Sequence, residues 1–208
     1  MTSRHIANGQ DIPHGPAPEL PQTAWAVLGL LSFPGERTGY ELKKWADSSL
    51  RFFHWSPAIS QIYAELRRLE ERGYVTSARS GPEEPRAKRR YAITDAGRAA
   101  LDAWAAGEGG PVVLKHPLVL RVWLGHLAAP ERLRALVEDH LALTRDELAE
   151  VRAALARARE EPRWRHPVVA LRWSERRLLA ELELAREMLT DLDHLPADGR
   201  SEDRCDGA

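Results

Sequence analysis

The sequence predicts a mainly α-helical protein with one small β-hairpin, in which a compact N-terminal domain is followed by two long antiparallel helices. Two observations lead to this fold class. In residues 22–106, apolar residues first recur at helical spacing, then alternate on both sides of a turn rich in proline and glycine, and then return to helical spacing. In residues 130–192, spacings of three and four persist through two segments separated by a proline.

The composition indicates an ordinary globular protein. Of its 208 residues, 43% are hydrophobic and 29% are charged, and no apolar run approaches the roughly 18 residues that a membrane helix needs. The first 21 residues lack the apolar run of an export signal, so we expect a cytoplasmic protein that does not enter a membrane. A single cysteine, Cys205, excludes an internal disulfide and a cysteine-rich zinc site.

The chain begins with a segment that has no helical or strand period. Residues 1–21 contain four prolines and are expected to form a flexible tail. Residues 23–31 are apolar enough for a buried first helix, which Pro34 and Gly35 would end. Thr38 is a suitable N-cap for a second helix that ends near Ser49.

The third helix has the clearest boundaries in the sequence. Ser56 can cap it, Pro57 suits its first turn and Gly73 ends it. Its apolar residues fall within one sector of roughly 80° on a helical wheel. These residues are Ile59, Ile62, Leu66 and Leu69. The opposite face is small, polar and basic, and carries Ser60, Gln61, Ala64, Arg67 and Arg68.

A hairpin and a fourth helix complete the N-terminal domain. Residues 74–77 and 89–94 have the composition of strands and flank a turn that contains Gly81, Pro82 and Pro85. Thr94 can begin a helix that a glycine-rich break at 107–111 ends. The order of three helices, hairpin and helix is typical of a winged helix-turn-helix domain, which we place at residues 22–106.

Residues 111–195 are predicted to form a helical arm. A short helix is expected at 117–127, a long helix from Pro130 to about residue 160, and a last helix from His166 to Pro196. Two long helices cannot bury their apolar stripes against each other alone, so this arm is expected to be a dimerisation and effector domain. Residues 196–208 are acidic and expected to be disordered.

The outer face of the third helix suits DNA. An α-helix fits the major groove, where Ser60 and Gln61 can approach base edges while Arg67 and Arg68 reach phosphates or guanine. Ser56 and the free amides at the helix start could bind a phosphate. Residues 22–106 carry a net charge of +3 and residues 107–208 a net charge of −3, which also favours a nucleic-acid partner for the first part.

A basic run lies beside the hairpin turn. It consists of Arg86, Lys88, Arg89 and Arg90, which together could neutralise phosphates along the DNA backbone or the minor groove. Binding would then weaken steeply with salt. The alternative is that these are solvated hairpin charges offset by two neighbouring glutamates.

Three of these segments resemble the PadR family of transcriptional regulators. They are residues 38–42, 60–75 and 90–97, and together with the first helix they occur in the family's usual order. The resemblance implies a homodimer whose C-terminal helices embrace those of the partner, and repression of a neighbouring detoxification or efflux gene. It also implies that Ser60 and Tyr63 approach DNA and that Arg86, Lys88 and Arg89 form the basic wing.

Seven tryptophans are many for this length. Packing in cores and interfaces is one explanation. The other is an aromatic effector pocket between the arm and the winged domains. Its candidate residues are Trp123, His126, His140, Trp164, His166 and Trp173. A small aromatic effector bound there would change the spacing of the two recognition helices and release the DNA.

Other classes of protein have less support in the sequence. No common hydrolase, metalloprotease, nucleotide-binding or dinucleotide-binding motif occurs, so we expect no enzyme and no cofactor. His116 and His126 lie ten residues apart, which is not a spacing of metal ligands. A winged-helix dimer that acts as a protein scaffold without reading DNA stays open, because Glu65 and Glu71 lie in the third helix. A MarR-like regulator also stays open, although its dimer helices occupy both chain ends and the proline-rich start leaves little room for one.

Overall fold

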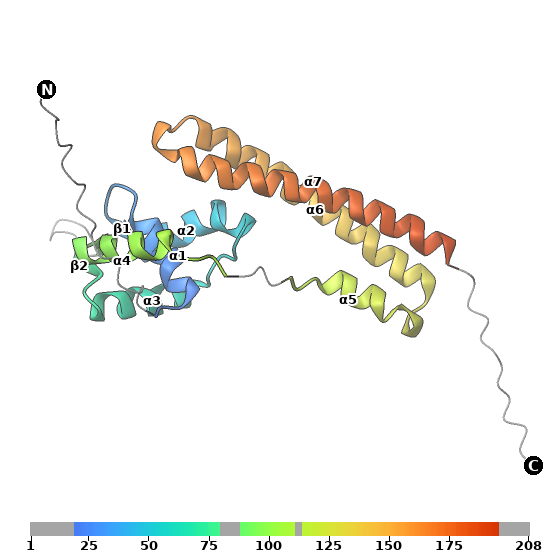
Figure 1. Ribbon diagram of the computed structural model, residues 1–208, viewed down its shortest axis with the longest axis horizontal. Helices are drawn as coiled ribbons and strands as arrows, with labels where there is room; N and C mark the ends of the chain where they lie inside the picture. Colours follow the sequence, from blue (N-terminus) through green and yellow to red (C-terminus); the bar gives the residue numbers. More distant parts are fainter. Residues whose placement is uncertain (1–18, 80–87, 111–113, 196–208) are drawn as a thin grey trace, which may run out of the picture. The chain divides into compact units, whose positions relative to one another are not determined.

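The protein divides into two compact units, Met1–Pro111 and Val112–Ala208 (Figure 1). The structure is a computed structural model that describes residues 19–79, 88–110 and 114–195. Both units are built mainly from helices, and the small sheet found among the described residues belongs to the first unit, so the predicted fold class is confirmed. No helix in the described part of the chain is both long enough and apolar enough to cross a membrane.

The first unit combines helices with a three-stranded antiparallel sheet in the order β1-β3-β2. Its elements are α1 (Gln22–Leu31), β1 (Arg37–Thr38), α2 (Gly39–Ser48), η1 (Leu50–Phe52), α3 (Ile59–Glu71), β2 (Val75–Arg79), β3 (Arg89–Ile93) and α4 (Asp95–Ala106). The predicted hairpin is β2 and β3, paired from Val75 with Ile93 to Arg79 with Arg89. The two-residue strand β1 was not predicted, and it adds to the other edge of β3.

The core of this unit lies between α1, α2 and α3. Leu28, Leu42 and Leu66 are fully buried there, and α1 is buried on almost all sides, as expected for a helix that is apolar around its circumference. Trp25 of α1 stacks on Trp104 of α4 with ring centroids 5.3 Å apart. The buried stripe of α3 is therefore fixed against α1 and α2, which turns the opposite face of α3 outward.

The start of α3 differs from the prediction. The helix begins at Ile59 with Ala58 as its N-cap, so Ser56 does not cap it, and Ile59 is exposed rather than part of the buried stripe. The predicted end is correct. Gly73 has a φ of +73°, and its N–H donates to Glu70 O while the N–H of Tyr74 donates to Leu69 O, which together form a Schellman motif.

The second unit is a helical hairpin with a short leading helix. Its elements are α5 (Pro117–Trp123), η2 (Gly125–Leu127), α6 (Pro130–Arg159), η3 (Pro162–Trp164) and α7 (Arg165–His194). The two long helices lie side by side along most of their length (Figure 1). Their contact buries residues such as Val137, Val151 and Leu178, whereas large apolar side chains elsewhere on both helices, including Leu143 and Leu184, stay exposed.

Candidate nucleic-acid interface

The exposed face of α3 carries the polar and basic side chains that the sequence places there. Ser60, Gln61, Arg67 and Arg68 are all exposed, as is Tyr63. Ile62, Leu66 and Leu69 are buried on the opposite side, together with Glu65. Glu65 is one of the two glutamates that had left the protein-scaffold interpretation open, and its burial removes it from the exposed face of α3. Arg68 Nε lies 3.4 Å from the Glu65 carboxylate.

The N-terminal turn of α3 is held by its own side chains. Gln61 Oε1 accepts a hydrogen bond from the Ala58 N–H at 2.8 Å, which satisfies one of the free amides of the first turn. Ser56 instead faces α2: its hydroxyl donates to Asp47 Oδ1 at 2.5 Å and accepts from Lys43 Nζ at 3.2 Å. Hydrogen bonds to Asp47, first that from Lys43 and then that from Ser56, hold the pKa of this carboxyl below its ordinary value.

Tyr63 joins α3 to the start of α2. A Cβ added to Gly39 would lie 2.5 Å from Tyr63 Cε1 and 2.7 Å from Cζ, so the tyrosine ring packs directly over the glycine backbone. Gly39 is the first residue of α2 and is buried. Because Gly39 has no side chain, the Tyr63 ring can pack on its backbone, and this contact fixes the direction of the Tyr63 side chain.

Arg89 and Arg90 of β3 form hydrogen bonds and ion pairs with neighbouring elements. Arg89 Nη2 donates to both carboxylate oxygens of Glu70, at 3.0 and 2.9 Å, and its Nε donates to Ser77 Oγ at 2.7 Å. Arg90 Nη1 donates to Glu36 O at 3.1 Å and lies 3.8 Å from the carboxylate of Glu41. These contacts connect β3 to the end of α3 and the start of α2, and both arginine side chains stay partly exposed, Arg89 at 54% and Arg90 at 38%.

The other predicted wing residues complete this surface. Lys88 is exposed immediately before β3. Arg86 lies outside the described residues, and its role stays a prediction. The structure thus brings the exposed face of α3 and the cations of β3 into one unit, within which Arg89 contacts α3 through Glu70.

Two family models match the chain. Residues 27–103 match the model described as the transcriptional regulator PadR-like family, and residues 114–193 match the model described as the virulence activator alpha C-terminal region. The N-terminal region of this chain, residues 27–103, is therefore a PadR-like domain. The family consists of transcriptional regulators, which confirms the prediction that the chain is not an enzyme. The second match also confirms the branch with an extended helical C-terminal region.

Relatives within the PadR-like family match most of the chain. The negative transcriptional regulator PadR of Bacillus subtilis (strain 168) is 28% identical over 131 residues, which are 62% of this chain and 71% of that protein. The crystal structure of B. subtilis PadR with operator DNA superposes with a TM-score of 0.71 at 24% identity, covering 83% of this chain and all of the other. B. subtilis PadR with p-coumaric acid gives a TM-score of 0.62 at 24% identity and covers 83% and 96% of the two chains.

The six predicted effector residues do not meet in one place. All of them lie in the second unit, where Trp123, His126, His166 and Trp173 are exposed and Trp164 is half-buried. His140 is also half-buried and contacts Glu181. An effector role for this set therefore stays a prediction.

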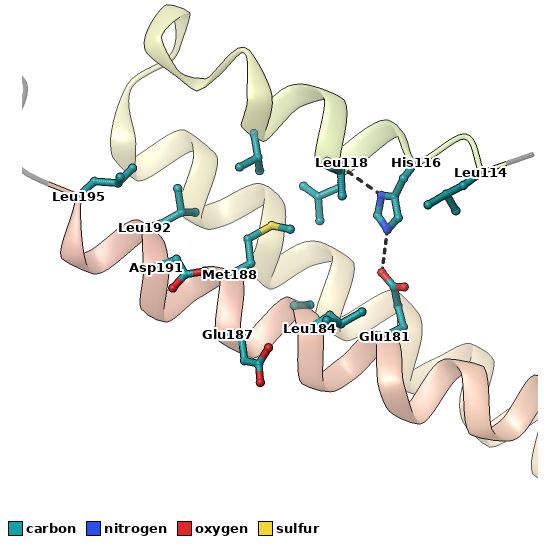
Figure 2. Close-up of a pocket in the computed structure, with 13 residues that line it drawn as sticks. Leu114, His116, Leu118, Glu181, Leu184, Glu187, Met188, Asp191, Leu192 and Leu195 are labelled. Carbon is teal, nitrogen blue, oxygen red and sulfur yellow. Dashed lines mark hydrogen bonds and ion pairs between the residues drawn. The ribbon is translucent and has the colours of Figure 1, made fainter.

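A cavity of about 630 Å³ lies between the α5 segment and α7, and none of the six residues lines it (Figure 2). Its wall is mainly aliphatic, with His116 and three carboxylates among the lining side chains. The apolar lining includes Leu114, Leu118, Val119, Val122, Leu184, Met188 and Leu192. No sequence pattern indicated this cavity, because its residues look like the ordinary apolar stripe of an amphipathic helix.

Proposed function

We propose that this PadR-like regulator is a homodimer that binds double-stranded operator DNA through α3 and the β3 cations and acts as a repressor. The observation that supports this proposal most directly is the exposed face of α3, on which Ser60, Gln61 and Arg67 stand opposite a fully buried aliphatic stripe. A helix with such a face fits a major groove, where small polar side chains reach base edges and arginines reach guanine or phosphate. The B. subtilis relative is named a negative regulator and has been solved with operator DNA, which agrees with the proposal.

Dimerisation through the helical arm has its own support. Large apolar side chains on α6 and α7 remain exposed in the single chain. They are Leu143, Val169, Trp173, Leu179 and Leu184. Exposed apolar surface on paired helices is typical of a protein-protein interface. We therefore propose that a second copy covers part of this surface.

The effector of the proposed repressor is a small aromatic molecule, by analogy with the p-coumaric acid complex of the B. subtilis relative. The cavity of the second unit has a volume within the range of ligand pockets and an aliphatic wall with a few polar groups. Its lining residues surround one space, whereas none of the six predicted tryptophans and histidines lines it. The substitution Met188→Gln in the cavity wall is expected to weaken effector-induced release of DNA, whereas Trp123→Leu at the exposed set should leave it unchanged.

Fluorescence anisotropy with DNA from the promoter beside the protein's own gene tests DNA binding. The wild-type protein is expected to prefer this DNA over a scrambled duplex, and its affinity should fall steeply as salt rises. Arg67→Ala should weaken binding and lower the slope of log affinity against log salt by about 0.9, the loss of one phosphate contact. Arg172→Ala removes an exposed arginine from α7 and serves as the matched control.

The outcomes distinguish a regulator that reads DNA sequence from a protein scaffold. Unchanged melting temperatures for Arg67→Ala would confirm that any loss of affinity comes from the interface and not from unfolding. Equal affinity for the promoter and the scrambled duplex would contradict sequence-specific readout. Absence of any duplex binding would leave a scaffold that acts through protein contacts as the better explanation.

A further inference from the structure

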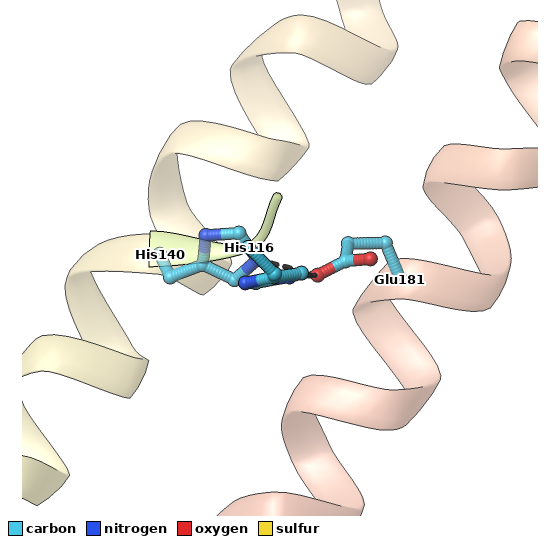
Figure 3. Close-up of side chains that lie close together, drawn as sticks. All are labelled: His116, His140 and Glu181. Carbon is cyan, nitrogen blue, oxygen red and sulfur yellow. Dashed lines mark hydrogen bonds and ion pairs between the residues drawn. The ribbon is translucent and has the colours of Figure 1, made fainter. Parts of the chain in front are cut away.

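Three side chains that are far apart in the sequence converge within the second unit. His116 is the N-cap of α5, His140 lies on α6 and Glu181 lies on α7 (Figure 3). Nε2 of each histidine lies 2.8 Å from the same carboxylate oxygen, Glu181 Oε1. The side chains are only 20%, 26% and 19% exposed, so the cluster is sheltered but still open to small solutes.

The chemistry of this trio matches a transition-metal site better than it matches a site for a hard cation. Two imidazoles and one carboxylate are a recurrent ligand set for Zn²⁺ and related ions, whereas Ca²⁺ and Mg²⁺ take oxygen ligands. The candidate ligand atoms of the three residues all lie within 4.8 Å of one another. Ligands of a tetrahedral zinc ion stand roughly 3.3 Å apart, so the two 2.8 Å separations need to open by only about half an ångström.

We propose that His116, His140 and Glu181 form a binding site for one Zn²⁺ ion, or a similar divalent transition metal, with the remaining coordination position open to water. The site would join the start of α5 to both long helices. It is separate from the DNA interface. It shares His116 and Glu181 with the wall of the proposed effector cavity, but it does not depend on an effector being bound there. The ten-residue spacing of His116 and His126 had argued against a metal, but the three helices assemble a different set of ligands.

A hydrogen bond of His116 links metal binding to the start of α5. His116 Nδ1 accepts from the Val119 N–H at 3.3 Å, so in the metal-free protein the ring carries its proton on Nε2 and donates it to Glu181. A metal on Nε2 displaces that proton, and the neutral ring then carries hydrogen on Nδ1. The Val119 amide loses its acceptor, so metal occupancy changes the cap of α5.

Isothermal titration of the full-length, untagged and metal-stripped protein with ZnCl₂ tests the site. We expect one Zn²⁺ per chain, no comparable heat with MgCl₂, and a large shift of the Val119 amide signal in an NMR spectrum of the labelled protein. His140→Gln and Glu181→Gln are expected to weaken Zn²⁺ binding by about 100-fold or more, since even residues that only support metal ligands are worth about 10- to 100-fold. His126→Gln and His166→Gln remove exposed histidines of the same unit and should leave the affinity unchanged.

Two further measurements keep the test decisive if a variant is unstable. Circular dichroism of the metal-free variants establishes whether they fold. Co²⁺ titrated into the wild-type protein should give the intense visible absorption of a four-coordinate site, and this measurement needs no variant. Weak absorption like that of hydrated Co²⁺, unchanged Zn²⁺ affinity in folded His140→Gln, or an equal loss in His126→Gln would each overturn the proposal.

Discussion

The guanidinium of Arg89 is held by Glu70 in the free protein, so Glu70→Gln is expected to strengthen DNA binding. Arg89 donates two hydrogen bonds to the Glu70 carboxylate and a third to Ser77. The same N–H groups of Arg89 would donate to a DNA phosphate. A phosphate contact therefore competes with an internal ion pair. Removing the carboxylate charge removes most of that competition.

The exposure of the pair limits the size of the effect. The side chains of Arg89 and Glu70 are 54% and 30% exposed, and ion pairs with this access to water are worth between 0 and about 1 kcal/mol. If the whole pair must break in the complex, Glu70→Gln tightens the dissociation constant by up to about fivefold. The free energy of unfolding should fall by no more than about 1 kcal/mol for the same reason.

Anisotropy titrations at several salt concentrations measure this effect. Glu71→Gln is the matched control, because it removes an exposed charge from the next position of α3 and leaves the Arg89 pair intact. Arg89→Ala should weaken binding and lower the salt slope by about 0.9, and Glu70→Gln should then add no more than the control does. If Glu70→Gln weakens binding, or if it gains no more than Glu71→Gln does, the competition between carboxylate and phosphate is refuted.

Three other substitutions test the local geometry of the first unit. Gly97→Ala should destabilise the protein by about 2 kcal/mol or more in urea unfolding. The new Cβ would lie 2.2 Å from the carbonyl oxygen of Tyr74, and a backbone atom cannot move aside easily. A variant as stable as the wild type would contradict this packing. Gly39→Ala should cost less stability, because the new Cβ would meet the Tyr63 ring, which can move. It should weaken DNA binding, because the displaced ring changes the exposed face of α3. A DNA affinity equal to that of the wild type would argue against a role for the Tyr63 ring. Glu41→Gln should reduce the loss of thermal stability in acid, because the N-cap N–H of α2 holds the pKa of the Glu41 carboxyl below its ordinary value of 4.5. The stabilising effect of the carboxylate is therefore present above pH 4.5 and is lost as the pH falls through the lowered pKa. If the variant and the wild type lose stability equally in acid, Glu41 makes no such contribution.

Elements with signals inside their own sequence were predictable. Thr38 and Thr94 cap α2 and α4 as expected, because each hydroxyl accepts from a backbone N–H three residues ahead. Gly73 ends α3 because the Schellman motif needs a left-handed residue that glycine adopts without strain. In these cases the residues that decide the structure lie within one turn of the position they affect.

Elements that depend on tertiary partners were missed. Strand β1 is only two residues long and exists because Arg37 and Thr38 pair with β3, more than 50 residues later in the chain. Ser56 looked like an N-cap, but Asp47 and Lys43 of α2 compete for its hydroxyl. No local pattern reports such competition, since the partner residues belong to another helix.

The candidate sites divide in the same way. Except at Ile59, the exposed face of α3 follows from helical periodicity, because one buried stripe determines where the other side chains of the helix point. The cluster of His116, His140 and Glu181 needs the register of α6 against α7 and the position of α5, and no single helix carries two of its members. The tryptophans and histidines of the sequence therefore indicated a site in the second unit, but they did not indicate that His116, His140 and Glu181 would contact one another. A polar site shared by three helices becomes visible only after their apolar stripes have been packed against one another.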